Sequence, residues 1–249
     1  MSVDLTDMLN GWPFEPGKIN VRLIHGIDGE PRVQIRLDLG ILQMHVDGRP
    51  DGARPEGYES YLEYCEAKLD LADEDTTLSA EDCRLLREEA VQYYHRYVAM
   101  LVLEDYERVL VDTTRNLRVL DVCSEHAEEE DDREILEQYR PYIVMMRARA
   151  LASQALAENE ANVAVVALDE GLDALRRHFT DKDMDPEQTT EVQMLRSMKD
   201  SLVPRLPVSQ QSELNQRLRE AVQQENYELA AILRDELRLL RGKVDEDQV

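Results

Sequence analysis

The stretch RVQIRLDLG, residues 32–40, decides the fold of the N-terminal part of this chain. Every second residue in it is apolar, namely Val33, Ile35, Leu37 and Leu39. Polar residues stand between them, namely Gln34, Arg36 and Asp38. Because successive side chains of a strand point to opposite faces, this alternation predicts a strand with one buried and one polar face.

Two neighbouring segments extend this pattern into a small sheet. INVRLI at 19–24 and ILQMHV at 41–46 read as strands, and HGIDGE at 25–30 carries the glycines and the aspartate of a turn. DGRPDGARPEG at 47–57 concentrates Gly and Pro and predicts a boundary. A three-stranded antiparallel meander is marginal alone, so we expect its apolar face to pack on the helices that follow.

From Tyr58 to Leu202 the apolar spacing becomes helical. The predicted helices lie near 58–72, 79–103, 105–128, 131–157, 160–178 and 186–203. Ser79 with Asp82 predicts a capped start, and Pro141 predicts a kink or break inside its helix. Asp185-Pro186-Glu187 predicts another start. The fold class is therefore α+β and mainly α, with VPRLP at 203–207 as a linker.

Residues 147–176 carry small residues at intervals, namely Ala152, Ala164 and Gly171, interspersed with leucines such as Leu151 and Leu168. This spacing resembles a tetratricopeptide helix pair, in which small residues let two antiparallel helices approach closely. A similar window at 104–120 lies roughly 55 residues away instead of the 34 residues of that repeat. An ordinary helical bundle with a seam of small residues explains the pattern as well.

Charge is distributed unevenly along the 249 residues. The 29 basic and 53 acidic residues give a formal charge of −24, a field that disfavours binding of a phosphate backbone. Residues 58–204 hold 16 basic and 35 acidic residues, whereas 205–243 hold 7 and 6. This contrast predicts three domains: a β-meander at 1–57, an acidic helical body at 58–204, and a terminal helical hairpin with an acidic tail at 205–249.

The terminal segment contains two amphipathic stretches, near 208–224 and 226–241. In the second, ENYELAAILRDELRLL at 225–240, Asn226 is a plausible N-cap and Gly242 a plausible C-terminal stop. Two helices this short form an antiparallel hairpin that leaves apolar surface uncovered. We therefore expect the remaining apolar stripe to be buried against a partner.

These residues resemble the UVR motif, a short hairpin of excinuclease subunits B and C, of Clp-class chaperone ATPases and of activators of a protein arginine kinase. Asn226 departs from the pattern of the motif, in which an acidic residue is common at this position. The resemblance implies a non-catalytic contact with a protein that carries another copy of the motif, or with a second copy of this chain. The implied partner-binding residues are Leu218, Val222, Tyr227, Ala230, Ala231, Leu233, Arg234, Asp235, Glu236, Leu237 and Leu240.

The N-terminal WPFEPGKINVR and RLDLGILQMHVDGRPDG also resemble a group of bacterial proteins that end in such a hairpin, and this resemblance implies no particular activity.

Other candidate sites have simpler explanations. Three cysteines without a C-x-x-C spacing predict reduced thiols and disfavour a disulfide framework or a zinc site. The five histidines show no paired ligand spacing, and EHAEEEDDRE at 125–134 reads as a solvated charge run. YYHRY at 93–97 predicts either helix packing or an aromatic peptide-binding groove. Trp12 is expected either to anchor the N-terminal segment or to project as a recognition element.

The sequence therefore predicts a non-catalytic cytoplasmic adaptor with no cofactor or metal. It has no secretory signal pattern and no apolar run long enough to span a membrane. Nucleotide-binding and nucleophile-elbow motifs are likewise not found in the sequence. The alternative is an accessory factor of nucleotide excision repair that acts beside the excinuclease subunits.

Overall fold

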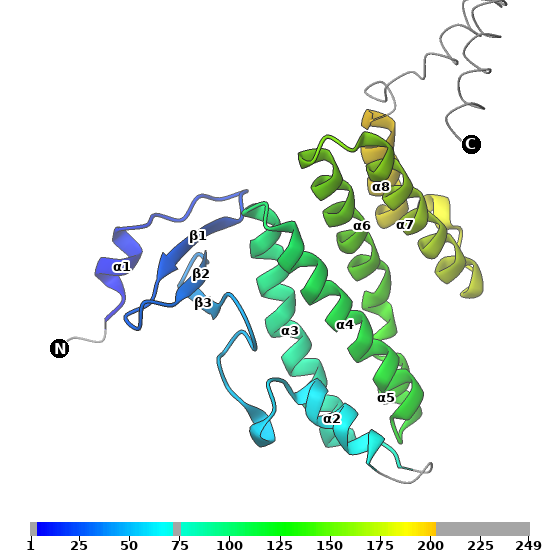
Figure 1. The fold of residues 1–249 in the computed structure, drawn as a ribbon, viewed down its shortest axis with the longest axis horizontal. Helices are drawn as coiled ribbons and strands as arrows, with labels where there is room; N and C mark the ends of the chain where they lie inside the picture. Colours follow the sequence, from blue (N-terminus) through cyan, green and yellow to red (C-terminus); the bar gives the residue numbers. More distant parts are fainter. Residues whose placement is uncertain (1–3, 72–75, 203–249) are drawn as a thin grey trace, which may run out of the picture. The chain divides into compact units, whose positions relative to one another are not determined.

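The computed structural model describes residues 4–71 and 76–202. The chain divides into two units, residues 1–202 and 203–249, and all described residues belong to the first. This unit is mainly helical, with one small antiparallel sheet near its N-terminus (Figure 1). The predicted α+β, mainly α class is confirmed.

The sheet is the predicted meander, with strand order β1-β2-β3. Its strands are β1 (Asn20–His25), β2 (Pro31–Arg36) and β3 (Ile41–His45). Val33 of β2 lies opposite Leu23 of β1 and Met44 of β3, so apolar residues share one face across all three strands. Gly29, at a φ of +82°, supplies the left-handed residue of the turn between β1 and β2.

The predicted division of β2 into a buried and a polar face is wrong in two respects. The strand ends at Arg36, so Leu37 and Leu39 lie beyond it, and Leu39 is 87% exposed. The polar residues Gln34 and Arg36 are buried. They are covered because the N-terminal segment folds back: the backbone oxygen of Trp12 accepts a hydrogen bond of 2.9 Å from Arg36 Nε.

Trp12 thus anchors the N-terminal segment on the sheet. The guanidinium of Arg22 lies 4.1 Å from the centre of the indole ring. Nε of Arg22 donates a hydrogen bond of 2.7 Å to the side-chain oxygen of Gln34. Gln34 in turn donates to Gln43 at 2.7 Å, so a chain of polar contacts crosses the sheet. The first of the two interpretations of Trp12 is therefore confirmed.

A short helix, α1 (Thr6–Asn10), precedes the sheet, and the other helices follow it in the chain. They are α2 (Tyr61–Asp70), α3 (Ala80–Val102), α4 (Tyr106–His126), α5 (Glu130–Glu134), α6 (Arg140–Ala157), α7 (Ala161–Asp181) and α8 (Thr190–Leu202). The 3-10 turns are η1 (Pro55–Gly57), η2 (Glu137–Tyr139) and η3 (Pro186–Gln188). The predicted capping box of Ser79 and Asp82 is confirmed at the start of α3.

Two predicted helices need correction. The helix predicted over 131–157 is divided into α5, η2 and α6, because Pro141 falls in the first turn of α6 and cannot continue a preceding helix. Asp185 caps only the 3-10 turn η3, where its side chain accepts from the Glu187 amide, and α8 begins later, at Thr190. The helices predicted near 208–224 and 226–241 lie outside the described residues.

A seam of small residues joins α6 and α7. At Gly171 a methyl group would lie 2.5 Å from Cβ of Ala148 and 3.0 Å from a methyl of Leu195. No real side chain tolerates such a contact, so glycine permits the close approach of these helices. This arrangement agrees with both readings of the 147–176 pattern.

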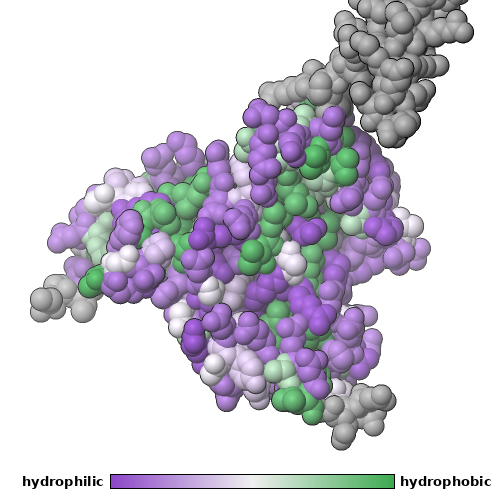
Figure 2. Space-filling view, in the orientation of Figure 1, coloured by the Kyte–Doolittle hydropathy of each residue, from purple (hydrophilic) through white to green (hydrophobic). Residues whose placement is uncertain are grey.

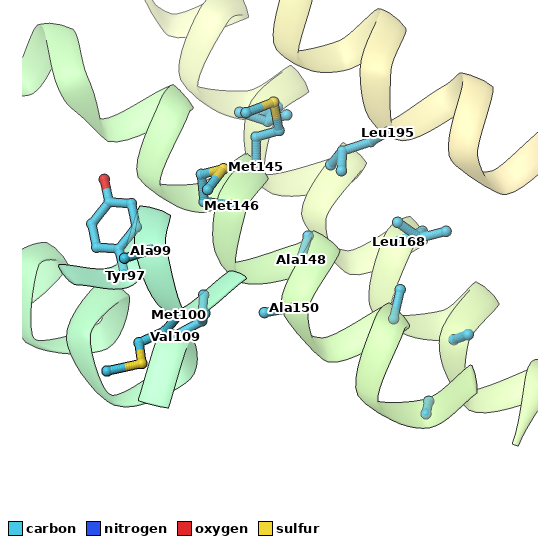
Figure 3. Packing of buried hydrophobic residues seen from close by; sticks show 14 of the residues in the cluster. Tyr97, Ala99, Met100, Val109, Met145, Met146, Ala148, Ala150, Leu168 and Leu195 are labelled. Atoms are coloured by element: carbon cyan, nitrogen blue, oxygen red, sulfur yellow. The ribbon is translucent and has the colours of Figure 1, made fainter. Parts of the chain in front are cut away.

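One apolar core joins the sheet to the helices. Figure 3 shows part of its helical side, where Met100, Met145 and Leu168 are labelled. It includes Val33 and Met44 from the sheet, Met100 from α3, Met145 from α6 and Leu168 from α7. A second cluster of buried residues packs α2 against α3 and α4. Hydrophilic residues predominate on the face drawn in Figure 2, where apolar residues gather over the sheet.

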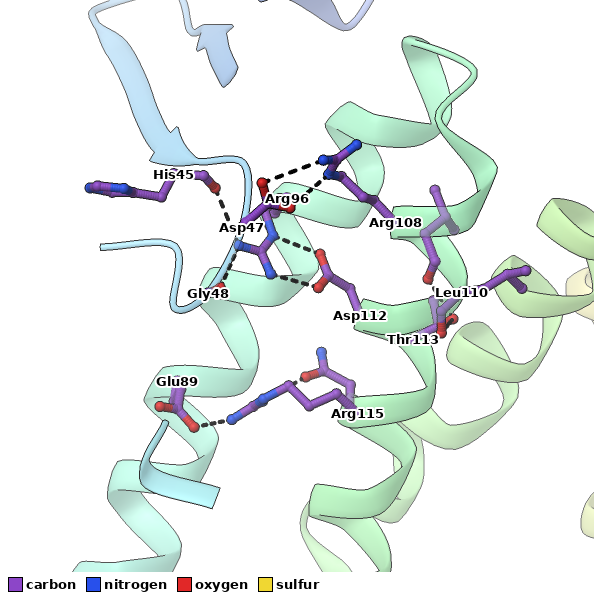
Figure 4. A network of polar contacts seen from close by, with 12 residues as sticks. His45, Asp47, Gly48, Glu89, Arg96, Arg108, Leu110, Asp112, Thr113 and Arg115 are labelled. Atoms are coloured by element: carbon purple, nitrogen blue, oxygen red, sulfur yellow. Dashed lines mark hydrogen bonds and ion pairs between the residues drawn. The ribbon is translucent and has the colours of Figure 1, made fainter. Parts of the chain in front are cut away.

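Arg96 links the end of the sheet to two helices (Figure 4). From α3, it donates two hydrogen bonds to the Asp112 carboxylate of α4, at 2.8 and 2.7 Å. It also donates to the backbone oxygens of His45, at 3.2 Å, and Gly48, at 2.6 Å. Both charged side chains are almost completely buried, so each depends on the other for compensation.

Glu89 plays a similar part for α2. Its buried carboxylate accepts from the amides of Tyr61, at 2.7 Å, and Leu62, at 3.2 Å, in the first turn of α2. Arg115 of α4 pairs with the same carboxylate. A carboxylate at a helix N-terminus satisfies amides that have no partner within the helix, so Glu89 fixes α2 on α3.

We predict that Arg96→Met destabilises the protein by about 3–5 kcal/mol, because it leaves the Asp112 carboxylate buried without its partner. Replacing both partners, in Arg96→Met with Asp112→Leu, should restore much of the loss. Urea unfolding measures both changes. Arg84→Met is the matched control on α3, because the ion pairs of Arg84 are exposed and contribute about 0–1 kcal/mol. An Arg96 variant as stable as the Arg84 variant would contradict this account.

Asp82 gives a prediction for pH. Partial burial opposes ionisation of its carboxyl, but hydrogen bonds from Lys68, Tyr61 and Ser79 outweigh it and lower the pKa from 3.8 to about 2. A depressed pKa contributes stability above the unfolded value that is lost as the pH falls from about 4 to about 2. Relative to Asp82→Asn, the wild-type free energy of unfolding should fall by about 2 kcal/mol over this range. If urea unfolding gave the same change in the free energy of unfolding for wild type and for Asp82→Asn over this pH range, the assignment to Asp82 would be contradicted.

Candidate functional site

The residues predicted to bind a partner, from Leu218 to Leu240, lie outside the described residues. Their role as contacts stays a prediction. Within the described part of the chain, a pocket of about 480 Å³ lies between α3, α4 and the segment that runs from Ile135 into α6.

Four tyrosines line this pocket. Tyr94 and Tyr97 come from α3, Tyr139 from η2 and Tyr142 from α6. The ring centre of Tyr94 lies 5.5 Å from that of Tyr97 and 6.1 Å from that of Tyr142. Tyr94 is 39% exposed, whereas Tyr97 is buried, so the cluster extends from the core to the surface.

The two interpretations of YYHRY each describe part of the arrangement. Tyr93 is buried and points away from the pocket residues, with the guanidinium of Arg115 3.8 Å and that of Arg96 4.8 Å from its ring centre. Tyr97 lies in the core and also lines the pocket, and Tyr94 completes the pocket wall. Helix packing therefore explains Tyr93, while the neighbouring tyrosines form an aromatic concavity.

The remaining wall is mostly apolar. It is formed by Val91, Leu120, Ile135, Leu136 and Ile143, among others. Aliphatic side chains from three elements thus face the tyrosine rings, and a ligand that enters would lose most of its contact with water.

Two charged or titratable side chains other than tyrosine line the pocket. Arg87 pairs with Asp132, which neutralises its charge locally. Burial lowers the pKa of His95, so the imidazole is neutral at pH 7. Among the described lining residues none is a carboxylate. The apolar and aromatic walls are suited to binding a ligand.

Sequence reasoning singled out Tyr93, Tyr94 and Tyr97 but missed Tyr139 and Tyr142. These two lie more than forty residues further along the chain and reach the pocket only through the packing of α6 on α4. The chain breaks before α6 because Pro141 lies in its first turn, and this break positions both tyrosines at the pocket. Pro141 is therefore the sequence signal that pointed to their position.

The three cysteines are close together and buried. Cys65, Cys83 and Cys123 are free thiols in the cluster that joins α2, α3 and α4. Burial raises the pKa of Cys65 to about 12, and a hydrogen bond with Cys83 together with burial raises the pKa of Cys123. The same hydrogen bond lowers the pKa of Cys83, but its side chain is inaccessible to solvent.

In the ranges 4–71 and 76–202, no three His, Cys, Asp or Glu side chains gather as metal ligands. Within the same ranges, no helix combines the length and apolar character that crossing a bilayer requires.

We predict that all three thiols resist a disulfide reagent in the folded protein at pH 8, because their burial keeps the reagent from reaching the sulfur atoms. Unfolding in guanidinium chloride should release three reactive thiols per chain, measured by absorbance of the released reagent. Val111→Cys is the positive control, since Val111 is 62% exposed on α4 and should give one fast-reacting thiol. Fast labelling of the wild-type protein would show that the α2–α3–α4 cluster opens readily.

Comparison with known proteins identifies the C-terminal segment. A family model described as the UvrB/uvrC motif matches residues 209–243. No curated protein and no solved structure matches the chain, and the tetratricopeptide resemblance of the middle region is not confirmed. The motif is found in nucleotide excision repair proteins, where it is a small interaction element and not a catalytic one. The chain therefore carries a UvrB/uvrC motif at residues 209–243, as its C-terminal sequence predicted.

Proposed function

We propose that this protein is a non-catalytic adaptor that binds a protein partner through its C-terminal UvrB/uvrC motif. The observation that carries the proposal is the match of residues 209–243 to a motif that mediates protein–protein interaction. The partner would be a protein with its own copy of the motif, or a second copy of this chain.

The proposed mechanism is burial of the apolar stripe from Tyr227 to Leu240. A patch of about 300–400 Å² gives roughly 8–10 kcal/mol of gross hydrophobic free energy. Association entropy and ordering of side chains offset much of this, so micromolar affinity is expected. Arg234, Asp235 and Glu236 would contribute ion pairs of about 0–1 kcal/mol each if they are exposed.

The charge distribution supports a partner-binding role for the segment 205–243 in particular. The segment 205–243 is nearly neutral, so it meets a partner without the repulsion that the acidic residues of 58–204 create. We propose the boundary between them near residue 204, and the cytoplasm as the place of action. The net charge of −24 argues against direct binding to nucleic acid.

A second candidate function is an accessory factor of nucleotide excision repair. The occurrence of the motif in proteins of that pathway favours it. In that case the partner would be an excinuclease subunit, and the acidic body would remain away from DNA. Filter binding of duplex DNA at low salt tests whether the protein acts directly on DNA. Salt-sensitive retention of the duplex would require contacts with its phosphates.

We predict that Leu233→Asp with Leu237→Asp reduces recovery of the partner at least tenfold in a quantitative pull-down from the native host. Two carboxylates in the proposed contact would have to be desolvated without a partner. Leu39→Asp with Leu71→Asp is the charge-matched control, since both leucines are 87% exposed in the described part of the chain.

Both double variants should keep the wild-type circular dichroism and unfolding transition. Equal recovery of the same partner by wild type and by the Leu233/Leu237 variant would disprove the role of the motif. Loss of recovery with the Leu39/Leu71 variant alone would place the contact within residues 4–71 and 76–202.

A further inference from the structure

We infer that the tyrosine pocket on the helical body binds a small organic cation with an apolar body, such as a quaternary ammonium compound. The pocket belongs to residues 87–143, and none of its described lining residues lies in the UvrB/uvrC motif. The inference therefore concerns other residues of the chain than those of the proposed adaptor contact.

The size of the pocket fits a small molecule. Its volume of about 480 Å³ falls within the range of about 300–1,000 Å³ that is typical of ligand sites. Val91, Leu120 and Ile143 give it apolar walls that would hold an aromatic or branched alkyl group.

The aromatic rings supply the recognition of positive charge. A cation is attracted to the face of a tyrosine ring, and ligand cages for quaternary ammonium groups are built from several such rings. Tyr94 stands between Tyr97 and Tyr142, so a group near Tyr94 meets more than one ring. The same interaction is present at the preceding residue, because the guanidinium groups of Arg96 and Arg115 lie over the ring of Tyr93.

The electrostatic surroundings favour a cation over an anion. Residues 125–139, which lead into the pocket wall at Ile135 and Tyr139, contain eight acidic residues and one arginine, and two of the acidic residues, Asp132 and Glu137, pair with Arg87 and Arg140. The charge of Arg87 is neutralised by Asp132, and His95 is neutral at pH 7. With a net charge of −24 on the whole chain, an anion would be repelled before it reached the pocket.

A neutral apolar ligand is the alternative occupant. It would fill the same walls by hydrophobic burial alone and would gain nothing from the tyrosine faces or the acidic segment. The comparison of a cation with a neutral molecule of the same shape therefore separates the two.

The experiment is isothermal titration of the full chain with phenyltrimethylammonium, with tert-butylbenzene and with benzoate. The first two molecules differ in whether nitrogen or carbon carries the three methyl groups. We expect the cation to bind at least about fivefold more tightly than its neutral isostere, and benzoate not to bind.

Variants locate the site. Tyr94→Leu keeps an apolar wall but removes the central ring, and should weaken binding of the cation at least about threefold while changing binding of tert-butylbenzene little. Tyr58→Leu is the matched control, because Tyr58 is similarly exposed and lies outside the pocket. Equal or tighter binding of the neutral isostere, no binding of the cation, or an unchanged affinity in Tyr94→Leu would each overturn the inference.

Discussion

The buried pair of Arg96 and Asp112 is the interaction on which the arrangement of the body depends. One guanidinium is shared between a carboxylate of α4 and two backbone oxygens, those of His45 at the end of β3 and of Gly48 just beyond it. A buried charge costs several kcal/mol unless it is fully satisfied, so the pair is stable only when the sheet, α3 and α4 are all in place. The pair therefore favours a single arrangement of these three elements over looser alternatives.

This constraint explains how a sheet too small to be stable alone becomes part of a larger fold. Three short strands bury little apolar surface by themselves. Here Val33 and Met44 join the same core as Met100 and Met145, and Arg96 fixes the edge of that contact. The α3 residues that line the tyrosine pocket, from Arg87 to Tyr97, lie around Arg96, so the shape of the pocket relies on the same packing of α3, α4 and α6.

The regular features of the fold could be predicted because they depend on local sequence. Alternation around Val33 predicted the strand, the capping box at Ser79 predicted the start of α3, and Pro141 predicted the break before α6. The burial of Gln34 could not be predicted, since it follows from a segment around Trp12 that folds back on the sheet. The part of the pocket wall formed by Tyr139 and Tyr142 was missed for the same reason, because Tyr94 and Tyr142 meet only through helix packing.

The central claim is that the sheet and the helices form one cooperative unit. Native-state hydrogen exchange at increasing denaturant tests it most directly, by comparing the amides of β2 with those in the middle of α3 and α4. If Arg96 and the common core join them, the free energies of exchange should converge on one value, that of global unfolding. Exchange of the β2 amides at a free energy well below that of α3, unchanged by denaturant, would show that the sheet opens independently and would contradict the account.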